Sequence, residues 1–440
     1  MPPSRTRMNL ERSTLVQWLD RPRSQLWCVV SWIVATAVFI GVTSLLGGLT
    51  QLDALLSTYT SWSIAHGNVA CAFPPGSSVE FPLTAPLYPV IAGGLAALFR
   101  VGHGVPFPNQ AALGQSCLHW LAPMTRWADR TDALTVTLRF GYLGWIALAS
   151  GIIAVMRSSG RGRNGWEPAV LTAVACTPPV ATCLEYFFHP QDLLAMGLIL
   201  LSVSCAQRNR WTWAGLLIGL AFTSQQFALL AAALLFVLVP AKRRLAFSLS
   251  AVITFAVLVI PLTALSSGRA LRVALTGSGE GGPLTSSFEW ELHLTGSTSI
   301  DVFRILPVIA AVLLALWARR RLSETVMEPV ALLSLLATTM ALRLVFEGGL
   351  YGYYFMASAV AIVLLDFVRR KFRIEVILWL AIGALVFSPL RSGHDPLTYG
   401  VHMWVWQLVF VPPTVALAVW PLIGRIRQRS SSHVVTEAAR

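Results

Sequence analysis

Long apolar runs alternate with short polar segments along almost the whole 440-residue chain. An α-helix needs about 20 apolar residues to cross a hydrocarbon core of about 30 Å, and many runs reach or approach that length. Backbone polar groups in lipid must be satisfied internally, which favours helices. The pattern therefore predicts an all-α polytopic membrane protein with about 12 transmembrane helices (11–13). The predicted spans lie near 27–49, 135–156, 168–186, 190–206, 211–224, 225–240, 245–265, 302–318, 328–346, 351–368, 374–391 and 402–424.

Two apolar segments leave alternatives open. The segment 211–240 is too short for two full-length spans, so it forms either two short or broken helices or a single tilted helix. The segment 84–99 is the second ambiguity. Counting it as a span would place the arginines after position 156 outside the membrane, so we treat it as a juxtamembrane or re-entrant helix.

Composition and charge support the membrane class and set an orientation. Hydrophobic residues make up 55% of the chain and charged residues only 12%. The net charge of +13 would suit nucleic acid, but the basic residues form short clusters between apolar runs, as expected for loops retained in the cytoplasm. We therefore expect no nucleic-acid partner and both termini in the cytoplasm. The first run is long for a signal peptide and is interpreted as an uncleaved anchor.

This topology divides the chain into three parts. The expected parts are a cytoplasmic N-terminal segment, 1–26, a single transmembrane domain, 27–424, and a disordered cytoplasmic tail, 425–440. Two large outer loops, 50–134 and 266–301, belong to the transmembrane domain.

Acidic and histidine side chains follow several spans on the predicted outer face. Asp53 comes just after the first span, where a carboxylate can act as a general base; a solvated interfacial aspartate is the plain alternative. His189, Gln191 and Asp192 form the turn HPQD between two spans. Helix capping alone would account for Asp192 but not for His189. One His with one Asp indicates a metal only weakly, so we predict no metal site and no cofactor, with a divalent metal as an unsupported alternative.

Arg343 lies inside an apolar segment near its outer end, where an ionisable side chain is costly and usually functional. Its planar guanidinium suits the phosphate of a lipid-linked donor; a snorkelling pair with Glu347 is the alternative. Arg139, at the outer start of the second span, either shares that phosphate or anchors the interface. The candidates for binding sugar or acceptor are His189, Gln191, Asp192, Gln225, Gln226, Glu347, Tyr351, Tyr354, His66 and His394, although tyrosines such as these and Tyr353 also populate interfacial belts.

Two cysteines, Cys71 and Cys117, fall in the first outer loop. An oxidising compartment would allow them to form a disulfide that stabilises the loop by about 3–4 kcal/mol; two free thiols are the alternative. The chain lacks GxxxxGK[ST], a Rossmann glycine fingerprint, HExxH and paired CxxC motifs. These absences disfavour an ATP-driven pump, a cytosolic nucleotide-sugar enzyme and a zinc protease.

Five features together resemble a known class of enzymes. They are Asp53 after the first span, FPLTAPLYPVIAGGLAALF at 81–99, HPQDLLAMGLILL, GLAFTSQQFALLAAALLF and RLVFEGGLYGYYFMASAVAIVLL. The arrangement resembles GT-C membrane glycosyltransferases, especially the actinobacterial polyprenyl-phosphate-sugar enzymes such as the mannosyltransferases of cell-envelope lipids. The resemblance implies direct, inverting transfer of a sugar, mannose favoured, from a polyprenyl-phosphate donor to a lipid or envelope glycan, with Asp53 as the base. It also implies a site facing outside a bacterial cytoplasmic membrane, and we expect a monomer.

A second function class fits many of the same features. A transporter or flippase of lipid-linked sugars would also have many helices, embedded polar groups and an amphipathic substrate. Transporters often contain repeated halves, and this chain shows no clear repeat, which favours the enzyme. An inactive scaffold of the same class is a third interpretation, and an arabinofuranosyltransferase is the alternative to a mannosyltransferase.

Overall fold

The computed structural model describes residues 17–21, 24–46, 51–73, 85–101, 105, 121–162, 164–185, 188–276, 297–346, 352–370, 373–387 and 408–427. The regular elements of these residues are helices, without a β-strand among them. The α-helices are α2 (Gln25–Leu46), α3 (Gln51–Ala65), α4 (Val69–Ala72), α5 (Leu87–Leu98), α6 (Leu121–Thr131), α7 (Ala133–Ser158), α8 (Trp166–Ala175), α9 (Pro178–Glu185), α10 (Pro190–Gln207), α11 (Trp211–Ser224), α12 (Ala228–Leu238), α13 (Ala241–Leu265), α14 (Arg269–Thr276), α16 (Ser297–Leu322), α17 (Pro329–Phe346), α18 (Met356–Val368) and α19 (Ile374–Phe387). Two 3₁₀ helices, η2 (Ser323–Met327) and η3 (Gly352–Phe355), and a last helix, Leu408–Arg427, complete the set.

The lengths of these helices establish a multi-pass membrane protein. Within the described ranges, six helices are long and apolar enough to span a membrane: α2, α7, α10, α13, α17 and Leu408–Arg427. Helices α8 and α9, bent by 60°, add a seventh if they form one broken span. Each of the twelve predicted spans overlaps a helix or a helix pair, but twelve crossings are not confirmed and stay a prediction. Segment 211–240 forms two short helices, α11 and α12, instead of one tilted helix.

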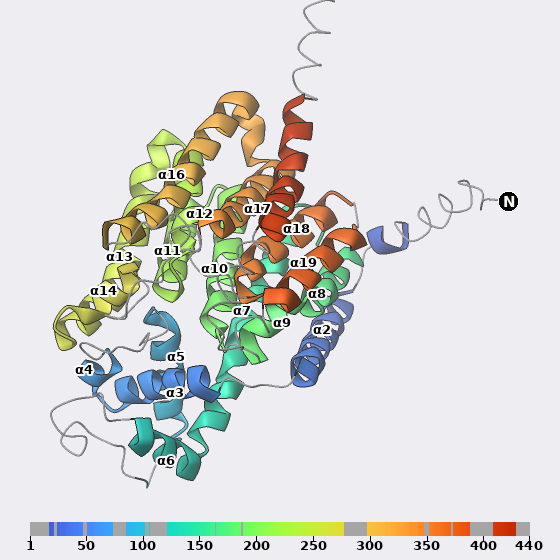
Figure 1. Cartoon of the computed structure of the whole chain (residues 1–440). Helices are drawn as coiled ribbons and strands as arrows, with labels where there is room; N and C mark the ends of the chain where they lie inside the picture. Colours follow the sequence, from blue (N-terminus) through green and yellow to red (C-terminus); the bar gives the residue numbers. More distant parts are fainter. Residues whose placement is uncertain are drawn as a thin grey trace, which may run out of the picture.

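Helix α10 forms the centre of the bundle, between α7 and α11 (Figure 1). It packs most extensively on α7, where glycines let the two backbones approach closely. A Cβ atom at Gly197 of α10 would lie 2.3 Å from the backbone carbon of Ala147 in α7, a distance that no real side chain adopts. This close packing fixes the position of the turn from which α10 begins.

Helices α3, α4, α5 and α6 gather at one end of the molecule (Figure 1). All four come from the predicted outer loop 50–134, and α5 occupies the segment 84–99. At 12 residues α5 is about 18 Å long, shorter than a hydrocarbon core, and it packs on α3. Helix α14, from the second predicted outer loop, joins this layer because Arg269 Nη2 donates to Ala70 O at 3.2 Å.

Candidate active site

The turn HPQD is buried at the start of α10. His189 is the N-cap residue, and Pro190 begins the helix, where its missing N–H costs nothing. Gln191 and Asp192 lie in the first turn and are also buried. The preceding residue, the buried Phe188, has a φ of +48°, which is unfavourable for a bulky side chain. Strain of this kind is often found at functional sites, where the surrounding structure enforces it.

The turn between α11 and α12 donates hydrogen bonds to HPQD. Ser224 Oγ donates to the backbone oxygen of Gln191 at 2.9 Å, and Gln225 Nε2 donates to Asp192 Oδ1. The backbone N–H of Gln226 donates to Gln225 Oε1 at 3.2 Å, and the side-chain Nε2 of Gln226 donates to the backbone carbonyl of Val273 in α14 at 3.1 Å. Asp192 therefore has a tertiary partner besides its place at the helix start, and capping alone does not describe its role.

His189 connects the turn with Asp53 in the first turn of α3. Its Nε2 atom lies 3.9 Å from Asp53 Oδ2, beyond hydrogen-bonding distance but within ion-pair distance when the histidine is protonated. Gln191 Nε2 lies 2.8 Å from His189 Nδ1. With the amide nitrogen as donor, Nδ1 accepts, and the ring proton of neutral His189 is on Nε2, facing Asp53. Asp53 remains 21% exposed, so its carboxylate is accessible to a ligand.

A row of aromatic rings connects His189 with Arg343. The His189 ring stacks on Tyr353 with centroids 4.2 Å apart and planes 17° apart, and Tyr353 packs against Tyr354 at 4.6 Å. The Arg343 guanidinium carbon lies 5.0 Å from the Tyr354 ring and 4.9 Å from the Phe227 ring. Two aromatic faces therefore stabilise this cation.

The structure brings together most of the predicted candidates that it describes. Asp53, the HPQD side chains, Gln225, Gln226, Tyr354 and Arg343 form one connected cluster. The sequence did not distinguish Tyr353 from tyrosines of an interfacial belt, and Phe227 and Ser224 had no signal apart from their place beside the two glutamines. The predictions for Glu347, Tyr351, His394 and Cys117 lie outside the described residues, as does the side chain of Cys71.

Two candidates lie away from this cluster. His66 follows the far end of α3, about 20 Å from Asp53 at 1.5 Å per residue. Its Nδ1 lies 2.8 Å from Trp62 O, and its ring lines a separate cavity of about 110 Å³ that Arg100 also lines. Arg139 is exposed on α7, and no hydrogen bond, ion pair or ring contact joins it to the described part of the cluster.

The described residues contain no group of three or more His, Cys, Asp or Glu side chains placed to hold a metal ion. Asp53 and His189 provide only two such groups at their point of contact.

The chain matches a known family of enzymes. The model of glycosyltransferase family 87 matches residues 120–346, just over half of the chain. The matched region contains HPQD, the turn between α11 and α12, and Arg343, but neither Asp53 nor Tyr353. No curated protein matches the chain.

Proposed function

The chain belongs to glycosyltransferase family 87, a GT-C-like membrane family, and we propose that it transfers a sugar from a polyprenyl-phosphate-linked donor to a lipid or cell-envelope glycan. Mannose is the favoured sugar, and the outer face of a bacterial cytoplasmic membrane is the favoured side. One observation carries the proposal: an accessible carboxylate and a cation lie at the two ends of one row of packed aromatic rings. Direct glycosyl transfer from a phosphate donor requires a base and a cation of this kind.

Asp53 is the proposed general base. It takes the proton of an acceptor hydroxyl, whose oxygen bonds to the anomeric carbon on the face opposite the phosphate. The bond from that carbon to the phosphate oxygen breaks, and the electron pair leaves with the polyprenyl phosphate. The configuration is therefore inverted. His189 lies beside Asp53 and is proposed to orient its carboxylate through the Nε2–H group.

Arg343, in preference to Arg139, is proposed to bind the donor phosphate. Its guanidinium lies in the cluster, whereas Arg139 is exposed on α7. A planar guanidinium carries N–H groups at its edge, and phosphate oxygens match their geometry. The cation stabilises the negative charge that develops on the leaving group.

Gln191 is the best-supported candidate for recognising a sugar hydroxyl. Its side chain is fully buried, and Oε1 has no hydrogen-bond partner among the described residues. A buried acceptor without a partner costs about 1–3 kcal/mol, which a hydroxyl donor would recover. Asp192, the next residue, accepts from Gln225 Nε2, and both are proposed to add polar groups for the same sugar.

The test is transfer of labelled sugar to native membrane lipids by the purified full-length protein. Polyprenyl-phosphate-mannose and polyprenyl-phosphate-arabinofuranose are compared, each with wild type, Asp53→Asn and the control Asp129→Asn, which removes an exposed carboxylate of α6. We expect transfer from one donor, lost in Asp53→Asn and retained in Asp129→Asn. Near-normal transfer by Asp53→Asn would reject the base, and absence of transfer from both donors would reject the donor class.

A further inference from the structure

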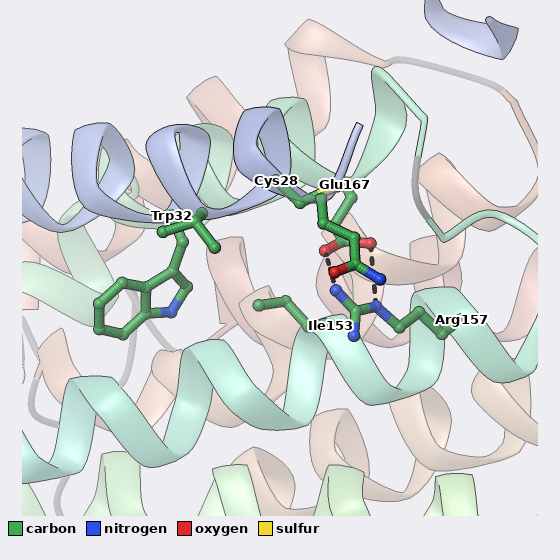
Figure 2. Close-up of a pocket in the computed structure, with 7 residues that line it drawn as sticks. Cys28, Trp32, Ile153, Arg157 and Glu167 are labelled. Atoms are coloured by element: carbon green, nitrogen blue, oxygen red, sulfur yellow. Dashed lines mark hydrogen bonds and ion pairs between the residues drawn. The ribbon is translucent and has the colours of Figure 1, made fainter. Parts of the chain in front are cut away.

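A second cavity lies far from the candidate active site, between α2, α7 and α8 (Figure 2). Its volume of about 380 Å³ is within the roughly 300–1,000 Å³ typical of ligand pockets. The lining residues are Gln25, Cys28, Val29, Trp32, Ile153, Arg157 and Glu167. Arg157 lies in the last turn of α7, about 36 Å from the start of that helix beside α6. The cavity therefore belongs to the opposite end of the bundle from α3–α6.

The cavity has one polar end and an apolar wall. Figure 2 shows the Arg157–Glu167 pair at one end and Trp32 toward the other. Val29 and Ile153 supply apolar surface from the two facing helices. Only 22% of the apolar stretch of α2 is buried within the protein, so most of this stretch is left to face lipid. A membrane lipid can therefore reach the cavity from the side.

The geometry of Arg157 leaves part of its guanidinium available. Nε and Nη2 donate to the two carboxylate oxygens of Glu167, at 3.3 and 2.9 Å, and Nη1 makes no hydrogen bond to a described residue. The Glu167 side chain is only 3% exposed, whereas that of Arg157 is 41% exposed. The carboxylate thus holds the arginine in place, and the arginine offers its free edge to a ligand.

Further positive charge lies on the turn that follows α7, next to this polar end. The 159–162 turn folds back on Arg157, since a Cβ atom at Gly162 would lie 2.2 Å from Arg157 Cγ. Next to that glycine, Arg161 has a buried Nε without a hydrogen-bond partner in the described structure. Burial and the neighbouring Arg370 both lower the pKa of Arg161, whereas Asp20 acts in the opposite direction. Asp20 already accepts from Arg370 Nη2 at 3.0 Å, so the cations outnumber their acidic partners here.

The first turn of α2 adds a third attraction for anions. Gln25 and Cys28 line the cavity from the N-terminus of this 22-residue helix, where the helix dipole is positive. Basic pockets between transmembrane helices on the cytoplasmic side commonly bind anionic lipid headgroups. The basic clusters at this end of the molecule are those that the charge pattern assigns to the cytoplasm.

We propose that this cavity binds an anionic glycerophospholipid of the cytoplasmic leaflet, with the headgroup phosphate at Arg157, within the positive field of the neighbouring Arg161, and an acyl chain along Val29, Trp32 and Ile153. The site is independent of sugar transfer. It recognises the lipid by its net negative charge and its acyl chain, and the bound lipid holds α2 against α7 and α8. A zwitterionic lipid with the same acyl chains makes the same contacts with the apolar wall, but it has no net negative charge to balance the excess of positive charge.

Native mass spectrometry of the purified full-length protein tests this site with phosphatidylglycerol and phosphatidylcholine of identical acyl chains. We expect wild type to retain phosphatidylglycerol about tenfold better. The double variant Arg157→Gln/Glu167→Gln removes the cation without leaving a buried carboxylate unpaired, and it should lose this preference. Arg161→Gln, which leaves the ion pair intact, should weaken it severalfold.

The control is Arg210→Gln, which removes an exposed arginine at the start of α11 and should keep the preference. Equal retention of both lipids by wild type would overturn the proposal. An unchanged preference for phosphatidylglycerol in the folded double variant would also overturn it. So would an equal loss of that preference in Arg210→Gln and Arg161→Gln, because general surface charge would then explain the binding. If the double variant does not fold, Arg161→Gln against Arg210→Gln decides the question.

Discussion

Two glycines of α7 meet α10 in the same way but at different distances from the candidate active site. A Cβ atom at Gly144 would lie 2.5 Å from the Pro190 carbonyl oxygen, inside the HPQD turn. A Cβ atom at Gly151 would lie 2.5 Å from the Gly197 carbonyl oxygen, two turns further along α10. Replacing either glycine by alanine therefore creates the same steric conflict at two positions of one interface.

The size of the effect follows from the geometry. Ordinary contact begins at 3.4 Å, so each methyl group forces a local separation of about 0.9 Å. Overpacking of this kind costs about 1–3 kcal/mol, and the better helix propensity of alanine recovers about 1 kcal/mol. Both variants should therefore lose up to about 2 kcal/mol of stability. A displacement of about 1 Å at reacting groups costs about 10²-fold in rate, so only Gly144→Ala should lose transfer on that scale.

The assay pairs thermal unfolding in detergent with the rate of sugar transfer at saturating donor, well below the unfolding temperature. Gly41→Ala is the control, because a Cβ atom there meets nothing within 4 Å. It should leave the transfer rate unchanged and stabilise α2 slightly. Wild-type transfer by Gly144→Ala, or equal losses of transfer in Gly144→Ala and Gly151→Ala, would refute the link between this contact and the site.

Three further results are expected. Arg343→Ala should raise the KM for the donor about tenfold or more while leaving acceptor affinity unchanged, as steady-state kinetics will measure; an unchanged donor KM rejects the phosphate role. Tyr353→Phe should retain the stack on His189 and most of the activity, whereas Tyr353→Leu should lose at least tenfold in kcat, and equal activities would show that the ring does not position the histidine. Cys71 and Cys117 should resist alkylation until a reductant is added, as mass spectrometry of peptides will show; modification without reduction rejects the disulfide.

The sequence was informative where local chemistry determines structure. Continuous apolar runs predicted helices at every position where the structure has a long one, and Pro190 after His189 marked the start of α10. The break between α11 and α12 was predicted as one of two alternatives, because basic clusters flank 211–240 on both sides and two crossings of so short a segment require short helices. Each of these features depends on neighbours in the chain, which a sequence displays directly.

Contacts between distant segments were not predictable in the same way. His66 and Asp53 were both assigned to the outer face, but α3 separates them along its length. The sequence predicted Tyr354 but not Tyr353 as a binding residue, because which tyrosine of a short 3₁₀ turn faces His189 depends on how η3 packs. Side-chain pattern gives the face of a helix but not the partner that lies across it.

These distant contacts share one reference element, α7. The layer formed by α3–α6 contacts it through Thr58 of α3, whose Oγ1 donates to Thr137 Oγ1 at 2.7 Å. The bundle reaches it through the close approach of Gly144 to Pro190. Asp53 lies one turn before Thr58, and His189 immediately precedes Pro190, so both sides of the 3.9 Å contact are positioned from the same helix. The matched family region includes α7 and His189 but not Asp53. The acid therefore comes from a separate layer of the protein, and its alignment with the histidine depends on how rigidly α7 holds that layer.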